Sequence, residues 1–179
     1  MPLEPTTLLQ RQRQVRLLIL DVDGVLTDGS LFLGDGGEQY KAFHSRDGHG
    51  MRMAQQGGLE LAILTGRNSE VVLHRMRDLG VRHLLQGRRD KGEALKELLG
   101  QTGFAPEQSA FVGDDVVDLP AMRRVALGIA VADAHPLVLE HADWHTRERG
   151  GRGAVREVCE TLLAAQGRLE DILRAYVEA

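Results

Sequence analysis

The 179-residue chain has a single cysteine, only 4% aromatic residues and no long apolar run. Cys159 has no partner for an internal disulfide, which indicates a reducing compartment, and we expect a cytoplasmic protein. No apolar stretch approaches the roughly 20 residues of a membrane span, and the polar residues 1–14 lack the apolar centre of a signal peptide. A net charge of −4 offers no basic surface for nucleic acid or for an anionic membrane. The expected partner is therefore a small molecule.

The apolar residues form short runs that alternate with segments of helical periodicity. This alternation predicts an α/β fold, a doubly wound parallel sheet with helices on both faces. We expect one domain over residues 15–179, including a C-terminal helical tail that breaks near Gly167, and a frayed or partner-docked tail over residues 1–14. Strands are predicted at 15–20, 59–64, 83–85, 110–112 and 127–130, with an edge strand within 142–146. Helices are predicted at 47–56, 69–79, 91–102 and 116–125. Runs at 30–33 and 38–43 predict a β-hairpin that projects beyond the first strand.

Residues that carry chemistry follow the predicted strands, at the ends where an open parallel sheet binds its ligands. Asp21 and Asp23 follow the first strand, and Thr65 follows the second. Asp114 follows the fourth strand, and Lys91 opens a helix at the same edge. We expect all five side chains to converge in one crevice.

Several carboxylates in one crevice repel each other unless a cation neutralises them. Mg²⁺ suits Asp21, Asp114 and a backbone carbonyl near Asp23, because it keeps open positions for substrate phosphate. Asp21 is placed to attack phosphorus and form an aspartyl-phosphate, while Asp23 is suited to protonate the leaving alcohol and later deprotonate water. Thr65 and Lys91 are suited to hold the phosphoryl oxygens. The predicted catalytic residues are therefore Asp21, Asp23, Thr65 and Lys91.

Each of these short motifs has an ordinary structural interpretation when it is taken alone. Asp-x-Asp is typical of a turn, and Gly-Asp-Asp is typical of a helix cap. Asp115 and Asp118 are predicted to support Lys91 or to cap a helix rather than to bind metal, with Asp115 the stronger candidate for the supporting role. Four motifs in order, each at a strand exit or a helix start, favour the catalytic interpretation.

The motifs together resemble those of the haloacid dehalogenase superfamily of phosphatases. They are Asp21-Val22-Asp23-Gly24-Val25-Leu26-Thr27-Asp28, Thr65-Gly66-Arg67, Asp90-Lys91 and Gly113-Asp114-Asp115-Val116-Val117-Asp118. Within that superfamily the chain is similar to the family of 3-deoxy-D-manno-octulosonate 8-phosphate phosphatases, through Arg46-Asp47-Gly48, Gly66-Arg67-Asn68-Ser69, Ala132-Asp133-Ala134-His135-Pro136 and Gly150-Gly151-Arg152-Gly153-Ala154-Val155-Arg156-Glu157. The resemblance implies a Rossmann-like core, Mg²⁺ on Asp21, the Asp23 carbonyl and Asp114, and a cytoplasmic step in making a lipopolysaccharide sugar.

Substrate selection is expected to depend on residues outside the four motifs. The stretches 29–64 and 92–113 are too short for a cap domain, which leaves a small crevice open to water that a neighbouring subunit could cover. The resemblance implies a homotetramer that does this. Arginine is the usual bidentate partner for the substrate carboxylate. The resemblance places at the sugar end His44, Ser45, Arg46, Asp47, Gly48, Arg52, Arg67 and Arg75, in addition to Asp23 and Lys91, and it implies that Gly151-Arg152 reaches an adjacent site. His44-Ser45 departs from the Asn-Val expected before Arg-Asp-Gly.

Other functions remain as alternatives. A phospho-receiver domain also uses acidic residues, Thr and Lys around magnesium, but there the acidic pair comes first and the Lys last, whereas here the pair near Asp114 follows Lys91. A non-catalytic oligomerisation module need not keep every catalytic residue. A phosphatase for another keto sugar acid, such as a nine-carbon acid 9-phosphate, is the nearest competitor. A zinc site at His141 and His145 is not favoured, since the predicted strand around them does not place both on one helix face.

Overall fold

A computed structural model describes residues 3–178, without the side chains of residues 38 and 39, and the ends of the predicted tails at 1–2 and 179 lie outside the described residues. Its centre is a six-stranded sheet in the order β5-β4-β1-β6-β7-β8, in which every pairing is parallel. The strands are β1 (Leu17–Leu20), β4 (Glu60–Leu64), β5 (His83–Leu85), β6 (Ser109–Gly113), β7 (Leu127–Ala130) and β8 (Trp144–His145). The predicted α/β class and parallel sheet are confirmed.

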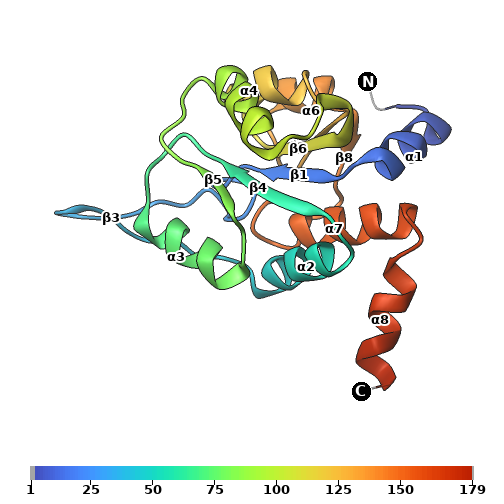
Figure 1. Ribbon diagram of the computed structural model, residues 1–179. Coiled ribbons are helices and arrows are strands. Elements are labelled where there is room, and N and C mark those ends of the chain that lie inside the picture. Colours follow the sequence, from blue (N-terminus) through green and yellow to red (C-terminus); the bar gives the residue numbers. More distant parts are fainter. Residues whose placement is uncertain (1–2, 179) are drawn as a thin grey trace.

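Helices cover both faces of the sheet (Figure 1). They are α1 (Pro5–Gln14), α2 (Ser45–Gln56), α3 (Glu70–Leu79), α4 (Lys91–Thr102), α5 (Leu119–Met122), α6 (Pro136–His141), α7 (Ala154–Ala165) and α8 (Leu169–Glu178), with 3₁₀ turns at Pro106–Gln108 and Val116–Asp118. Figure 1 shows α4 and α6 on one face and α2, α3 and α7 on the other. Within residues 3–178, none of these helices combines the length and the apolar character that a membrane crossing requires.

The central strand explains why the core forms where it does. All four residues of β1, Leu17–Leu20, are buried, because helices cover both faces and strands flank both edges. Full burial of each such side chain contributes about 1.5–3 kcal/mol. A continuous apolar run is therefore the pattern that a central parallel strand requires. The strand ends at Asp21, directly at the crevice.

The N-terminal segment differs from the prediction. Residues 5–14 form a helix rather than a frayed tail, with Pro5 in its first turn. Leu3 and Leu8 pack against the core, and the Gln166 amide donates to the carbonyls of Gln12 and Val15. Pro at the first helical position was the available signal. The polar sequence shows no clear apolar period for this helix, because the helix is stabilised by docking on α7.

Two further differences from the predicted helices lie between β6 and the edge strand β8. The predicted helix over 116–125 is a 3₁₀ turn followed by the short α5, because the Asp118 carboxylate folds back onto the backbone N–H groups of Asp114 and Asp115. The helix α6 was not predicted at all. Its N-cap is His135, whose ring accepts from Leu137 N–H, and Pro136 follows at the first helical position.

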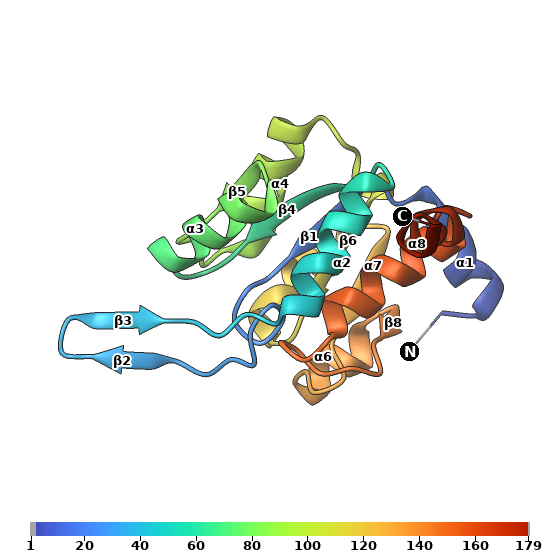
Figure 2. The same cartoon turned by 90° about the horizontal axis from the view of Figure 1, so that it is seen from below.

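The strands β2 (Phe32–Gly34) and β3 (Gly37–Tyr40) pair antiparallel as a separate two-stranded sheet. Figure 2 shows them extending away from the body of the molecule, on the side opposite α1 and α8. The hairpin is shorter than the predicted runs. Its apolar side chains Leu31, Phe32, Leu33 and Tyr40 are exposed within the chain.

Candidate active site

The ends of the central strands converge on one cavity of about 480 Å³. Asp21 and Asp23 follow β1, Thr65 follows β4, and Asp114 follows β6. The cavity is lined by Asp21, Asp23, Gly29, Thr65, Gly66, Arg67, Arg88, Arg89, Lys91, Asp114, Asp115 and Val117. The structure thus brings together all five side chains that were predicted to meet, and Arg67 joins them.

Asp21 is almost completely buried at the floor of the cavity. Its Oδ2 lies 2.8 Å from the Nζ of Lys91, whereas its Oδ1 is buried without a hydrogen-bond partner. Burial, followed by repulsion from Asp118, raises the pKa of Asp21 to about 6. One oxygen is therefore held by an ammonium, and the other has no hydrogen-bond partner among the described residues.

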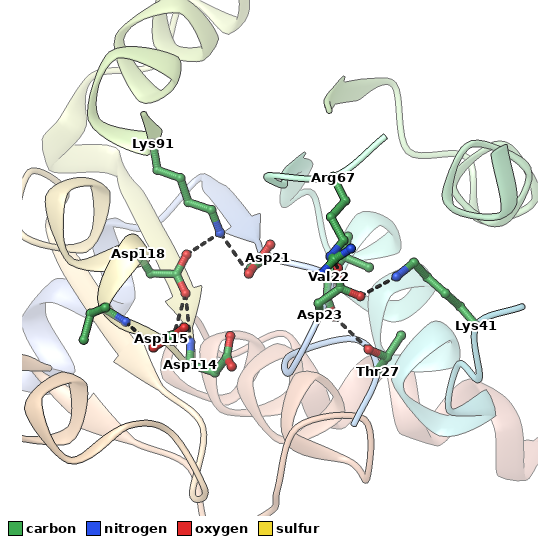
Figure 3. A network of polar contacts seen from close by, with 11 residues as sticks. Asp21, Val22, Asp23, Thr27, Lys41, Arg67, Lys91, Asp114, Asp115 and Asp118 are labelled. Carbon is green, nitrogen blue, oxygen red and sulfur yellow. Dashed lines mark hydrogen bonds and ion pairs between the residues drawn. The ribbon is translucent and has the colours of Figure 1, made fainter. Parts of the chain in front are cut away.

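Lys91 begins α4 and is buried between two carboxylates, those of Asp21 and Asp118 (Figure 3). Burial alone acts to lower the pKa of Lys91, but the two carboxylates outweigh it and the pKa is raised. Asp90 fixes the start of this helix by accepting the N–H groups of Gly92 and Glu93. The Lys91 ammonium thus lies at the cavity beside the carboxylate of Asp21.

Asp118, rather than Asp115, is the residue that supports Lys91. Its Oδ1 binds the ammonium, and its Oδ2 accepts the N–H groups of Asp114 at 3.0 Å and Asp115 at 3.2 Å. Asp115 caps the turn instead, accepting Val116 N–H at 2.7 Å. The prediction that Asp115 is the stronger candidate to support Lys91 is therefore wrong. The 3₁₀ turn at Val116–Asp118 brings Asp118 under Lys91. The prediction for Asp115 assumed a regular helix over 116–125 instead.

Oxygen atoms of Asp21, Asp114 and Asp118 lie within 4.8 Å of one another, so this group is suited to hold a cation. Asp114 Oδ1, like Asp21 Oδ1, is buried and has no hydrogen-bond partner in the part of the chain that the structure describes. Burial, followed by repulsion from Asp118 and Asp21, raises the pKa of Asp114 to about 8. Both oxygens of Asp118 are already bound within the chain. The two partnerless oxygens of Asp21 and Asp114 fit a hard divalent ion such as Mg²⁺.

Glycines allow the loop after β1 to approach these carboxylates. Gly24 has φ +86°, and a side chain there would lie 2.1 Å from Asp114 Oδ2. Gly150 packs against the Gly24 carbonyl, so the 150–152 segment covers the loop of its own chain. Arg152 adds an ion pair of 2.8 Å with Asp28. Within the chain, Gly151-Arg152 is therefore anchored beside Asp28, which is itself the turn residue that accepts Ser30 N–H.

Asp23 points away from Asp21, toward two cations that the structure brings to it (Figure 3). Its Oδ1 binds Lys41, and its Oδ2 lies 3.6 Å from the Nε of Arg67. Lys41 follows β3 directly and was not among the predicted site residues. No sequence motif marks Lys41, because its position beside Asp23 depends on the path of the chain after the hairpin.

Arg88 and Arg89 are two further cavity residues that sequence reasoning missed. The backbone N–H of Arg88 donates to the Thr65 carbonyl at 3.0 Å, which ties the loop before α4 to the end of β4. The Arg88 side chain is bound to Glu97 at 2.8 Å, which leaves Arg89 more available to a ligand. Their position just before Asp90-Lys91 was the available signal.

The remaining predicted substrate residues lie outside this cavity in the chain. Arg46 lines a separate cavity of about 420 Å³ at the start of α7. Arg52 and Arg75 both contact Asp78. His44 and Ser45 start α2, with the ring of His44 3.9 Å from Asp47.

Asp47 and Gly48, also predicted at the sugar end, lie where α2 meets α7 and α3. Asp47 is buried, and its two oxygens accept the N–H groups of Gly153 at 3.2 Å and Arg156 at 2.8 Å, which caps α7. Burial raises the pKa of Asp47 despite these bonds. A side chain at Gly48 would lie 2.3 Å from the Arg75 guanidinium. Within the chain, Asp47 therefore caps α7, and Gly48 leaves room for the Arg75 guanidinium.

Comparisons with known proteins identify the family of the chain. A model of haloacid dehalogenase-like hydrolases matches residues 83–157. The 3-deoxy-D-manno-octulosonate 8-phosphate phosphatase KdsC of Escherichia coli strain K12 is 52% identical over 163 residues, covering 91% of this chain and 87% of that protein. The chain belongs to the 3-deoxy-D-manno-octulosonate 8-phosphate phosphatase family.

Solved structures of this family share the fold over nearly their whole length. The Yersinia pestis enzyme has a TM-score of 0.89 at 49% identity, over 92% of this chain and 89% of that one. The Moraxella catarrhalis enzyme, solved in complex with magnesium, phosphate and KDO, has a TM-score of 0.93 at 37% identity, over 97% and 99%. The chain thus belongs to a family of phosphatases, and its predicted catalytic side chains lie around one cavity.

Proposed function

We propose that the protein is a Mg²⁺-dependent phosphatase that converts 3-deoxy-D-manno-octulosonate 8-phosphate to the free sugar acid and phosphate. The observation that carries the proposal is the buried Asp21, held by Lys91 and facing a cavity that also contains Asp23 and Thr65. Membership of a family named for this reaction, and the magnesium and KDO bound by the Moraxella catarrhalis relative, support the same substrate. An intact catalytic set argues against a non-catalytic oligomerisation module.

Each residue of the proposed catalytic set has its own role in the reaction. Asp21 attacks phosphorus and forms an aspartyl-phosphate, while Lys91 and Thr65 hold the phosphoryl oxygens. Asp23 gives a proton to the leaving sugar oxygen, and then takes one from the water that cleaves the intermediate. Asp118 holds Lys91 and the backbone of Asp114 in place.

Magnesium fits the two partnerless oxygens of Asp21 and Asp114, and the Asp23 carbonyl is the third protein ligand that we assign. When bound, Mg²⁺ neutralises the carboxylate cluster and offers open positions to substrate oxygen. Without a cation, burial and repulsion from Asp118 and Asp21 raise the pKa of Asp114, which supports the assignment of a cation to this cluster.

A sugar-acid substrate brings a carboxylate in addition to its phosphate. Arg67 and Arg89 are the cavity arginines placed to meet it, since Arg88 is bound to Glu97. Arg46, Arg52 and Arg75 lie elsewhere in the chain, so their contact with substrate requires a neighbouring subunit.

We also propose a homotetramer in which neighbouring subunits cover the active site. The hairpin supports this arrangement, since Leu33 and Tyr40 are 66% and 68% exposed although they are apolar. Water at the open cavity weakens electrostatic stabilisation, and a covering subunit removes it. A cytoplasmic location is consistent with the free, buried Cys159.

The test is phosphate release, with and without Mg²⁺, from a panel of phosphorylated sugars. The panel contains 3-deoxy-D-manno-octulosonate 8-phosphate, a nine-carbon keto acid 9-phosphate and neutral sugar phosphates. Preference for the eight-carbon acid that is lost on chelation supports the proposal. Preference for the nine-carbon acid refutes the substrate but keeps the chemistry, and no release from any compound refutes both.

A further inference from the structure

Lys41 is a buried cation at the edge of the active site. Its side chain is only 1% exposed, although it directly follows the projecting hairpin. An ammonium removed from water is costly unless a hydrogen-bonded counter-charge accompanies it. Here the Nζ of Lys41 binds Oδ1 of Asp23. A long, flexible side chain is thus held in one position at the proposed acid/base residue.

The two oxygens of Asp23 consequently have different surroundings. Oδ1 is occupied by Lys41, whereas Oδ2 lies 3.6 Å from Arg67 Nε, beyond hydrogen-bonding distance, in a side chain that is 22% exposed. Asp23 and Arg67 both line the cavity, but Lys41 does not. Figure 3 shows Lys41 on the side of Asp23 away from Asp21, and Oδ2 is the oxygen on the side of Arg67, which lines the cavity.

We propose that Lys41 is a positioning residue for the acid/base step, fixing Oδ1 of Asp23 so that Oδ2 is the oxygen that exchanges the proton. The inference rests on the proposed function. In the first half-reaction the ester P–O bond breaks, and the proton on Oδ2 passes to the leaving sugar oxygen, which becomes a hydroxyl group. In the second, the same Oδ2 accepts a proton from the attacking water as the aspartyl-phosphate is cleaved.

This role links the hairpin to catalysis. Lys41 is the residue after β3, so any displacement of the hairpin base moves the group that orients Asp23. A purely structural ion pair, which only anchors the hairpin, is the competing explanation. The two differ in one respect: orientation of a general acid matters only when the leaving group needs a proton.

The experiment compares Lys41→Met, which removes the hydrogen-bond donor, with Lys41→Gln, which keeps one. Each is assayed with the sugar-acid phosphate, an alkyl ester, and with p-nitrophenyl phosphate, whose leaving group needs no proton. For Lys41→Met we expect kcat on the alkyl ester to fall roughly tenfold or more, with KM and p-nitrophenyl phosphate turnover changed less than about twofold. Lys41→Gln is expected to recover part of the loss. Lys96→Met, at an exposed lysine paired with Glu93, is the matched control and is expected to behave as wild type.

A double-mutant cycle with Asp23→Asn completes the test. If Lys41 acts through Asp23, Lys41→Met has little further effect on kcat in the Asp23→Asn background. Equal losses on both substrates, or additive losses in the cycle, overturn the proposal in favour of a structural anchor. A wild-type chain that hydrolyses neither substrate refutes the proposed function and this role with it, whereas wild-type turnover with additive losses refutes only the role of Lys41.

Discussion

Lys91 and Asp118 form a buried ion pair beneath the proposed nucleophile. The pair joins the start of α4 to the loop after β6, because Asp118 also accepts the N–H groups of Asp114 and Asp115. One carboxylate thus positions both the cation that meets the phosphoryl group and the backbone that carries a metal ligand. Its neighbour Asp115 instead caps the turn on which it lies.

Asp118 is therefore expected to matter far more than Asp115. Asp118→Ala leaves the buried Lys91 with a single counter-charge and is expected to lower the free energy of unfolding by about 3 kcal/mol. Asp115→Ala removes only a cap and is expected to cost about 1 kcal/mol. Urea denaturation of the two variants measures both values. Equal losses would show that Asp118 has no special role.

Asp21→Asn is expected to abolish turnover, with kcat falling more than roughly a thousandfold, because the amide is not a nucleophile. The fold is expected to persist, since the substitution removes a charge whose burial is unfavourable. Phosphate release and the melting temperature are measured together. Asp171→Asn, at an exposed position of α8, is the matched control. Substantial residual activity of Asp21→Asn would disprove the assignment of the nucleophile.

Stability in a chelator is expected to fall as the pH rises. The pKa values of Asp21 and Asp114 are about 6 and about 8 in the folded chain and 3.8 in the unfolded one. The folded state therefore binds more protons between these limits, so the free energy of unfolding decreases as the pH rises from about 4 to about 8. Melting temperatures in EDTA measure the slope.

Added Mg²⁺ is expected to reverse this loss, most strongly at the upper end of the range, because it replaces the protons as the counter-charge. Asp114→Asn is the control, and it is expected to flatten the slope in EDTA. A chain whose melting temperature in EDTA rises across this range would contradict the electrostatic account of the site.

Arg89→Ala is expected to raise KM for the sugar-acid phosphate about tenfold, the effect of one lost charge-assisted hydrogen bond. Turnover of p-nitrophenyl phosphate, which has no carboxylate, is expected to remain unchanged. Arg82→Ala removes the same charge at an exposed position bound to Glu60 and serves as the control. Equal effects on both compounds would show that Arg89 does not select for the carboxylate.

Leu33→Asp is expected to dissociate the proposed tetramer, because it places a charge on the exposed apolar hairpin. Val177→Asp introduces the same charge on α8, where Val177 is 86% exposed, and is expected to leave assembly unchanged. Light scattering after size-exclusion chromatography reports the mass of each variant. If only Val177→Asp dissociates the tetramer, the interface lies at α8 and the proposed role of the hairpin is contradicted.

The strands and the residues after them were predictable from the sequence. A buried parallel strand must be apolar on both faces, so β1, β4 and β7 appear as short apolar runs within a residue or two of their observed bounds. The polar residue that ends each run marks the sheet edge. For this reason Asp21, Thr65 and Asp114 could be placed together before any distance was known.

Helices that depend on docking were not predictable in the same way. The helix α1 has a polar sequence and is stabilised by contact with α7, while α6 is too short to show a period. Proline at the first helical position was the only local mark of either.

The sequence by itself determined the sheet, the order of the catalytic motifs and the family, because each depends on local patterns of burial and spacing. Only the tertiary structure decided the neighbours of each charged group. It put Asp118 rather than Asp115 under Lys91, committed Asp47 to capping α7, and brought Lys41 to Asp23. Such contacts join residues that are distant along the chain, or that a 3₁₀ turn brings together where a helix was predicted. They form because burying an unpaired charge is costly, and this cost depends on the tertiary surroundings rather than on the local sequence pattern.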